Sequence, residues 1–66
     1  MQLTVNGELQ DLPAPLTVAE LLGRLGIGAG RVAVEVNEEV VPRGTYATRQ
    51  LAGDDRVEIV HFVGGG

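Results

Sequence analysis

The sequence contains no cysteine, lysine, serine or tryptophan, and it has one histidine, His61. Without cysteine there is no disulfide framework, no thiolate metal site and no cysteine nucleophile. One histidine cannot build a zinc site alone, so we expect no metal centre. Cysteine, serine and lysine, on which most covalent catalysis depends, are absent, and histidine, the commonest acid–base catalyst, occurs once. We therefore expect that this chain is not an enzyme.

Positive charge is also scarce, because nine acidic residues stand against five arginines and give a net charge of -4. Phosphate backbones and anionic membrane surfaces repel such a chain, so we expect neither nucleic acid nor a membrane as a partner. No apolar run approaches the roughly 20 residues of a bilayer span. Residues 1–6 lack the features of a targeting segment, so we expect a cytoplasmic protein.

What is present fits one small folded domain. The chain has 66 residues, of which 44% are apolar and 21% charged, a composition typical of folded rather than disordered sequences. A domain of this size buries only about 60% of the surface that its unfolded chain exposes. Because no disulfide or metal supports it, packing of the apolar residues must stabilise the fold.

Local signals predict a β-hairpin followed by a helix. Residues 3–5 and 8–12 alternate in polarity, and Asn6-Gly7 between them favours a type I′ turn, whose two central residues need φ > 0. Thr17 and Glu20 form a capping box, which predicts that a helix begins after Thr17. Apolar residues at helical spacing give this helix one buried face, made of Val18, Leu21, Leu22 and Leu25.

The glycine-rich segment 26–30 invites comparison with phosphate-binding loops. Such a loop follows a strand and opens a helix, whereas this segment follows a helix and precedes a strand. The lysine of a nucleotide-binding loop is also missing. We therefore interpret Gly26 as the end of the helix and the rest of the segment as a flexible connector.

Alternating apolar residues predict three more strands, over residues 31–36, 39–41 and 56–63. Between the last two strands, segment 43–50 is polar and irregular, and Tyr46 within it is expected to anchor on the core. The strand 56–63 is the most apolar segment of the chain, so we place it in the middle of the sheet.

The order strand, strand, helix, strand, strand, strand predicts an α+β domain. One helix packs across one face of a mixed sheet of about five strands. If the helix crosses over the sheet, the first and last strands lie parallel in its centre, and this arrangement is the β-grasp, or ubiquitin-like, fold. We expect it to occupy residues 1–63 and to be followed by a flexible glycine tail at 64–66.

The last predicted strand places two large apolar side chains on the solvent side of the sheet. Successive strand residues point to opposite faces, so Glu58, Val60 and Phe62 share one face. Because the charged Glu58 belongs in water, Val60 and Phe62 form an exposed patch, which usually marks a partner site. We predict that this patch, with a polar rim from Arg43 and Glu58, binds partner proteins. A bulge that turns Phe62 into the core is the alternative, and His61 is interpreted as a surface or packing residue.

The sequence ends in Gly64, Gly65 and Gly66, directly after the apolar strand. A glycine tail has no side chains to obstruct a narrow channel, and three extended residues reach roughly 10 Å. Such a tail would carry the carboxylate of Gly66 into a partner's active site. There ATP would convert it to an acyl adenylate, and a sulfur nucleophile would convert the adenylate to a thiocarboxylate. A frayed end, or a fragment of a longer chain, is the alternative.

Four segments carry a likeness to a known family: residues 1–7, the helix opening 17–22, the stretch 34–43 that ends Val-Pro-Arg, and residues 53–66, which end His-Phe-Val-Gly-Gly-Gly. With these segments, nearly the whole chain resembles the ThiS family of sulfur-carrier proteins of thiamine biosynthesis. A diglycine end alone is shared by many carriers and modifiers, whereas the mid-chain and terminal motifs together are much more specific.

The resemblance implies a carrier that is not itself an enzyme and binds no permanent cofactor. A ThiF-like adenylating enzyme would adenylate Gly66, and a cysteine desulfurase or a rhodanese-like protein would supply the sulfur for a thiocarboxylate there. A ThiG-like thiazole synthase would then take this sulfur into the thiazole ring of thiamine. We expect the carrier alone to be a monomer.

Related functions stay open at this point. A sulfur carrier for molybdopterin, tRNA thiolation or cysteine synthesis has the same design. A β-grasp interaction module, which binds a partner through its sheet, would have the same body and an inert tail. Neighbouring genes of one of these pathways would distinguish the carriers from one another and from the interaction module.

Overall fold

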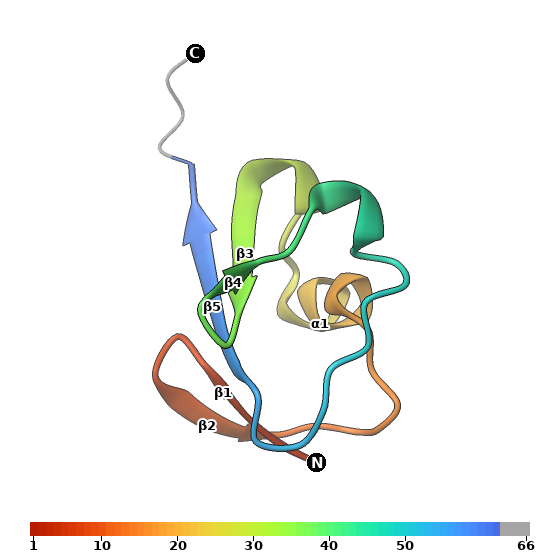
Figure 1. The fold of residues 1–66 in the computed structure, drawn as a ribbon, viewed down its shortest axis with the longest axis vertical. Coiled ribbons are helices and arrows are strands. Elements are labelled where there is room, and N and C mark those ends of the chain that lie inside the picture. Colours follow the sequence, from red (N-terminus) through yellow and green to blue (C-terminus); the bar gives the residue numbers. More distant parts are fainter. Residues whose placement is uncertain (63–66) are drawn as a thin grey trace.

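The computed structural model of the chain describes residues 1–62 (Figure 1). Two short 3₁₀ helices lie at Ala29–Arg31 and Arg43–Thr45. The main elements, in chain order, are β1 (Gln2–Val5), β2 (Glu8–Asp11), α1 (Val18–Leu25), β3 (Val32–Val36), β4 (Glu39–Val40) and β5 (Arg56–His61). This is the predicted order of elements.

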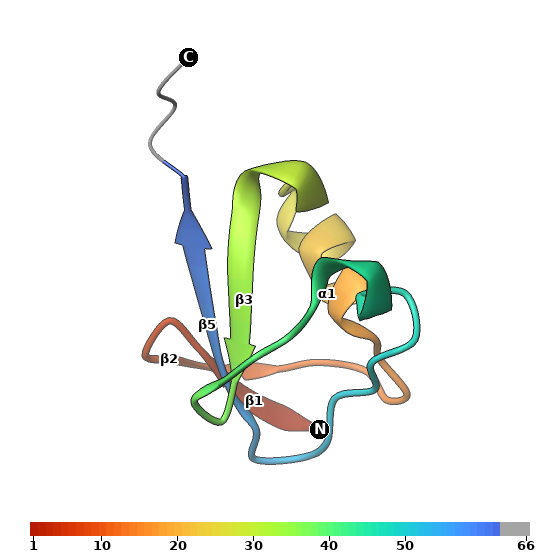
Figure 2. The same cartoon turned by 45° about the horizontal axis from the view of Figure 1, so that its top comes forward.

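The five strands form one mixed sheet in the order β2-β1-β5-β3-β4. The last strand, β5, lies in the middle and pairs parallel with β1 and antiparallel with β3. The outer pairs, β1–β2 and β3–β4, are antiparallel hairpins. The helix α1 packs across one face of this sheet (Figure 2). The β-grasp fold predicted from the sequence is therefore confirmed.

The core lies between α1 and the sheet. The periodicity of each strand and of the helix determines which residues point into it. In β3 every second residue is buried, as expected for a strand with one face in the core. Tyr46 is buried as well, so the predicted anchor of the irregular segment is confirmed. The buried apolar residues are Leu3, Val5, Leu12, Leu16, Val18, Leu21, Leu22, Val32, Val34, Val36, Val41, Tyr46, Leu51, Val57 and Ile59.

The predicted ends of α1 are confirmed in atomic detail. The backbone N–H of Glu20 donates to Thr17 Oγ1 at 3.1 Å, and the backbone N–H of Thr17 donates to Glu20 Oε1 at 2.9 Å. These two bonds complete the capping box, which satisfies amide donors that a helix start leaves unpaired. At the other end, Gly26 adopts φ 70°, the left-handed conformation that glycine accepts without steric cost.

Strand and connector boundaries differ slightly from the prediction. The connector 26–30 contains the start of a 3₁₀ turn, in which the Arg31 N–H donates to the Gly28 carbonyl at 3.1 Å, so β3 begins one residue late, at Val32. The strands predicted over 8–12 and 39–41 each end one residue early. At those ends a single backbone hydrogen bond continues the pairing. The assigned limit of each strand can therefore shift by one residue.

Two asparagine side chains form hydrogen bonds to β5, one on each side of the strand. Neither contact was predicted from the sequence. Asn6 and Gly7 adopt φ 49° and 83°, as the predicted type I′ turn requires. The side chain of Asn6 then reaches the central strand: its Oδ1 accepts from the Ile59 N–H at 2.7 Å and its Nδ2 donates to the Ile59 carbonyl at 3.2 Å. The Asn6 side chain thus continues the β1 pairing beyond the end of that strand.

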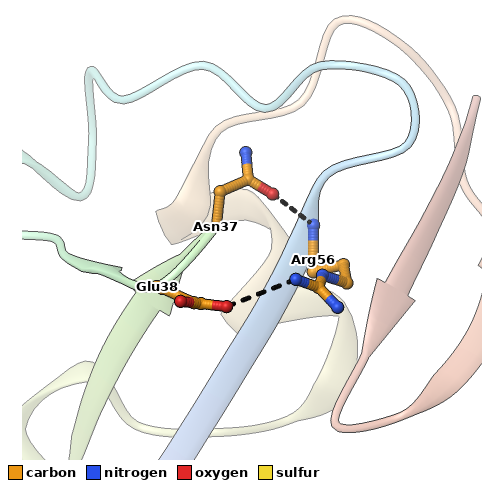
Figure 3. Close-up of polar contacts among 3 residues, drawn as sticks. All are labelled: Asn37, Glu38 and Arg56. Carbon is orange, nitrogen blue, oxygen red and sulfur yellow. Dashed lines mark hydrogen bonds and ion pairs between the residues drawn. The ribbon is translucent and has the colours of Figure 1, made fainter.

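Asn37, in the β3–β4 turn, likewise continues the pairing of β3 with β5 beyond the end of β3. It also has positive φ. Its Oδ1 accepts from the Arg56 N–H at 2.9 Å (Figure 3), and its Nδ2 donates to Asp55 Oδ1 at 2.9 Å. The Arg56 guanidinium also lies 3.4 Å from Glu38 Oε1. Both groups of this ion pair are exposed, so it contributes little to stability, whereas the asparagine bonds fix the start of β5.

We expect Asn6→Ala to destabilise the domain more than Asn6→Gly. Both variants lose the two bonds to Ile59, which leaves partly buried backbone groups unpaired at a cost of about 1–3 kcal/mol. Alanine adds roughly 1–2 kcal/mol for the left-handed backbone, which glycine tolerates. Urea denaturation would measure the free energies of unfolding, and amide exchange at Ile59 should quicken in both variants. An Asn6→Gly domain as stable as the wild type would contradict this role of Asn6.

Candidate functional site

The face of the sheet opposite α1 carries the predicted partner patch. The register places Val60 of β5 opposite Ala33 of β3, and Glu58 opposite Glu35, without interruption over five residue pairs. Val60 and Phe62 are 56% and 55% exposed. The prediction that both lie on the open face is confirmed, and the alternative in which a bulge turns Phe62 into the core is wrong.

Arg43 comes to this patch from a distant part of the chain. Its guanidinium carbon lies 5.9 Å from the centroid of the Phe62 ring, within the range of a cation–π interaction. Its Nη2 also donates to the Val32 carbonyl, at 3.4 Å. The N–H of Phe62 donates to the Arg31 carbonyl at 3.0 Å. The mid-chain Val-Pro-Arg motif and the last described residues therefore meet at one end of the sheet.

Sequence analysis missed two further exposed apolar side chains. Val40 of β4 is 70% exposed and Leu9 of β2 is 67% exposed. Val40 lies opposite Glu35 of β3, which places it on the open face, two strands from β5. Leu9 lies opposite Thr4 on the same face, two strands from β5 on the other side. The exposure of Val40 could have been predicted from strand alternation, because its neighbour Val41 is buried in the core.

Of the other residues considered in the sequence analysis, His61 lies in the described part of the chain and the terminal residues 63–66 do not. His61 is exposed at the end of β5, opposite Val32, which agrees with its interpretation as a surface residue. The predictions for Val63 and for the tail Gly64, Gly65 and Gly66 lie outside the described residues.

Residues 1–62 contain no pocket and no group of three His, Asp or Glu side chains that could hold a metal ion. Among their helices, none combines the length and the apolar character that a bilayer crossing requires. What this part of the chain offers instead is an exposed sheet face, apolar at Val60 and Phe62, beside the end of the central strand. A five-stranded mixed sheet with one helix across one face defines the class of β-grasp, or ubiquitin-like, domains.

Comparisons with known proteins place the chain within this class. The ThiS family matches residues 3–66. A thiazole synthase of Paramagnetospirillum magneticum is 47% identical over 66 residues, which are 100% of this chain and 20% of that protein. The sulfur carrier protein ThiS of Bacillus subtilis is 40% identical over 50 residues, 76% of each protein. The crystal structure of the thiamine biosynthesis protein ThiS of Geobacter metallireducens is 39% identical and covers 100% of both chains, with a TM-score of 0.85.

The chain belongs to the ThiS family, which confirms the resemblance found in its motifs. The Bacillus subtilis relative is named a carrier rather than an enzyme, in agreement with the expectation for this domain. The chain spans only 20% of the length of the two relatives named thiazole synthase that it matches at 47% identity. In those proteins, a segment like this chain is one part of a longer polypeptide.

We expect Phe62→Ala to change the free energy of unfolding by no more than about 1 kcal/mol. The exposed ring loses little burial, and its contact with Arg43 is worth about 0.5–1 kcal/mol. The matched control is Ile59→Ala on the inner face of the same strand, which should cost about 2–5 kcal/mol because it opens a cavity. Thermal and urea unfolding would measure both variants. A Phe62→Ala domain destabilised as strongly as Ile59→Ala would refute the assignment of Phe62 to the open face of the sheet.

Proposed function

We propose that this chain is a sulfur carrier of thiamine biosynthesis, and that its sulfur travels as a thiocarboxylate on Gly66. The observation that carries the proposal is membership of the ThiS family, whose match runs from residue 3 to residue 66 and so includes the three terminal glycines. The relative of Bacillus subtilis is named a sulfur carrier, and that of Geobacter metallireducens a thiamine biosynthesis protein.

The proposed chemistry takes place at the carboxyl carbon of Gly66. An ionised carboxylate is a poor electrophile, so ATP first transfers AMP to it, with release of pyrophosphate. A sulfur nucleophile at the oxidation level of hydrosulfide then attacks the acyl carbon and expels AMP. One C–O bond is replaced by a C–S bond, no net oxidation occurs at carbon, and the product is a thiocarboxylate.

Three partner proteins follow from this chemistry. A ThiF-like adenylating enzyme supplies the activation. A cysteine desulfurase or a rhodanese-like protein supplies the sulfur as a persulfide, and a thiol reductant releases it as hydrosulfide while forming a disulfide. A ThiG-like thiazole synthase accepts it. The last partner is supported by the relatives named thiazole synthase, which include a segment similar to this chain. Two functions joined in one polypeptide meet at a high effective concentration, which is useful when one hands a reactive group to the other.

The open face of the sheet is the proposed docking surface for these partners. Val60 and Phe62 supply its apolar part, and Arg43 and Glu58 supply its polar rim. Arg43 packs against the Phe62 ring, so the aromatic side chain is held before a partner arrives. Such preorganisation favours binding, because less side-chain freedom is lost in the complex.

We expect the full chain to gain the mass difference between sulfur and oxygen when it is incubated with a ThiF-like enzyme, ATP and a sulfur source. Intact mass spectrometry would measure this gain, and fragmentation should place it on Gly66. Deletion of Gly65 and Gly66 should abolish ATP–pyrophosphate exchange and leave thermal unfolding almost unchanged, since the deleted residues have no side chains to pack.

The control is Gly23→Ala, on the exposed side of α1, where an added Cβ meets no atom within 4 Å. This variant should be modified like the wild type and should gain up to about 1 kcal/mol of stability from helix propensity. A modification on an internal residue, or a truncated chain that is still adenylated, would refute the proposal. Attachment of the whole chain to lysines of other proteins would indicate a modifier instead of a sulfur carrier.

A further inference from the structure

The turn between β1 and β2 contains the dipeptide in which an asparagine side chain is most easily lost. The backbone nitrogen of the next residue can attack the side-chain amide of an asparagine, and a glycine in that position leaves its nitrogen unobstructed because it has no side chain. The chain has two asparagines, and only Asn6 is followed by glycine, since Glu38 follows Asn37. Asn6 is therefore the position at which this reaction is expected.

The reaction proceeds in two steps that need only water. The Gly7 nitrogen loses its proton to solvent and attacks the side-chain carbonyl carbon of Asn6. A C–N bond forms, the bond to Nδ2 breaks, and Nδ2 leaves with a proton from water as ammonia. Water then opens the resulting cyclic imide at one of its two carbonyl carbons, which yields aspartate or an isoaspartyl residue. Neither step oxidises or reduces the chain.

In the folded domain, both polar atoms of the Asn6 side chain are bonded to the central strand. Oδ1 accepts from the Ile59 N–H at 2.7 Å, and Nδ2 donates to the Ile59 carbonyl at 3.2 Å. These bonds turn the carboxamide toward β5, whereas ring closure requires its carbon atom to reach the Gly7 nitrogen. The turn is also fixed by the pairing of Val5 with Glu8 on either side of it. The folded sheet therefore opposes the reaction.

We propose that Asn6 is a deamidation site protected by the sheet, and that its side chain reacts with Gly7 only in molecules in which it has left Ile59. Such molecules form continually, because local and global opening occur in every native ensemble. Loss of the Asn6 amide therefore records how often this contact has opened. The inference concerns the turn itself and does not depend on the proposed function.

Each product weakens the contact that protected the amide. In an aspartate, one carboxylate oxygen still accepts from the Ile59 N–H, but the other faces the Ile59 carbonyl without a proton to donate. An isoaspartyl residue adds one carbon to the backbone of the turn, so the two-residue type I′ geometry is lost. A modified molecule therefore opens more easily than the original, and the strand that it loosens is the one that carries Val60 and Phe62.

The test follows the Asn6 amide in the full chain at mildly alkaline pH, over increasing concentrations of guanidinium chloride. Peptide mass spectrometry detects both products, because replacement of the amide nitrogen by oxygen changes the mass. Hydrogen exchange of the Ile59 amide, which donates to Asn6, reports how often the contact opens under the same conditions. Asn37 is the internal control: its side chain is bonded to Arg56 and Asp55, but it precedes glutamate.

Asn6 should deamidate at least about a hundredfold more slowly in the folded domain than in the unfolded chain, because few molecules are open at any moment. With added denaturant, its rate should rise in parallel with exchange of the Ile59 amide. Asn37 should react much more slowly than Asn6 in the unfolded chain.

Asn6→Asp, which reproduces one product, should lower the thermal midpoint by several degrees. The matched control is Gln50→Glu, which adds the same charge at an exposed side chain that forms no hydrogen bond within residues 1–62. This variant should unfold like the wild type.

Equal rates of Asn6 loss in the folded and unfolded chain would overturn the inference. So would an Asn6 that stays intact in the unfolded chain, or a rate that stays constant while exchange of the Ile59 amide rises. An Asn6→Asp domain as stable as the Gln50→Glu domain would refute the claim that the product weakens the contact.

Discussion

Strand β5 joins two hairpins that have no direct pairing with each other, since β1 and β3 meet only through it. Each backbone amide and carbonyl of a central strand needs a partner on one side or the other. β1 is too short to serve the whole of β5, and the side chain of Asn6 supplies the missing donor and acceptor for Ile59. On the other side of β5, the side-chain Oδ1 of Asn37 accepts from the Arg56 N–H. Two turn residues thus complete the sheet in its middle.

The same strand keeps buried core side chains and exposed apolar side chains on opposite faces of the sheet. Val57 and Ile59 point into the core, while Val60 and Phe62 point away from it. This separation follows from the two-residue period of a strand. A register shift by one residue would exchange the two faces. The asparagine bonds therefore have a second effect: they hold β5 in the one register that exposes Val60 and Phe62.

Local chemistry explains which features could be predicted from the sequence. The Asn6-Gly7 turn and the Thr17–Glu20 capping box involve residues at most three positions apart, so their signals are readable in the chain itself. The open-face position of Phe62 followed from strand alternation. The contacts of Asn6 with Ile59 and of Arg43 with Phe62 join residues that only the folded sheet brings together. No rule of sequence spacing predicts these contacts. The exact strand ends could not be predicted either, because each depends on a single backbone hydrogen bond in the folded sheet.

The central place of β5 also determines how the domain can fold. Each hairpin has mostly local contacts and can form early, but the two halves stay apart until the last described strand has been synthesised and has inserted between them. That step closes long loops and brings in contacts between distant residues, such as the 53 positions that separate Asn6 from Ile59. Chains dominated by such contacts fold slowly for their size. Until β5 inserts, the inner edges of β1 and β3 stay exposed, and the nascent chain is at its most vulnerable to mispairing.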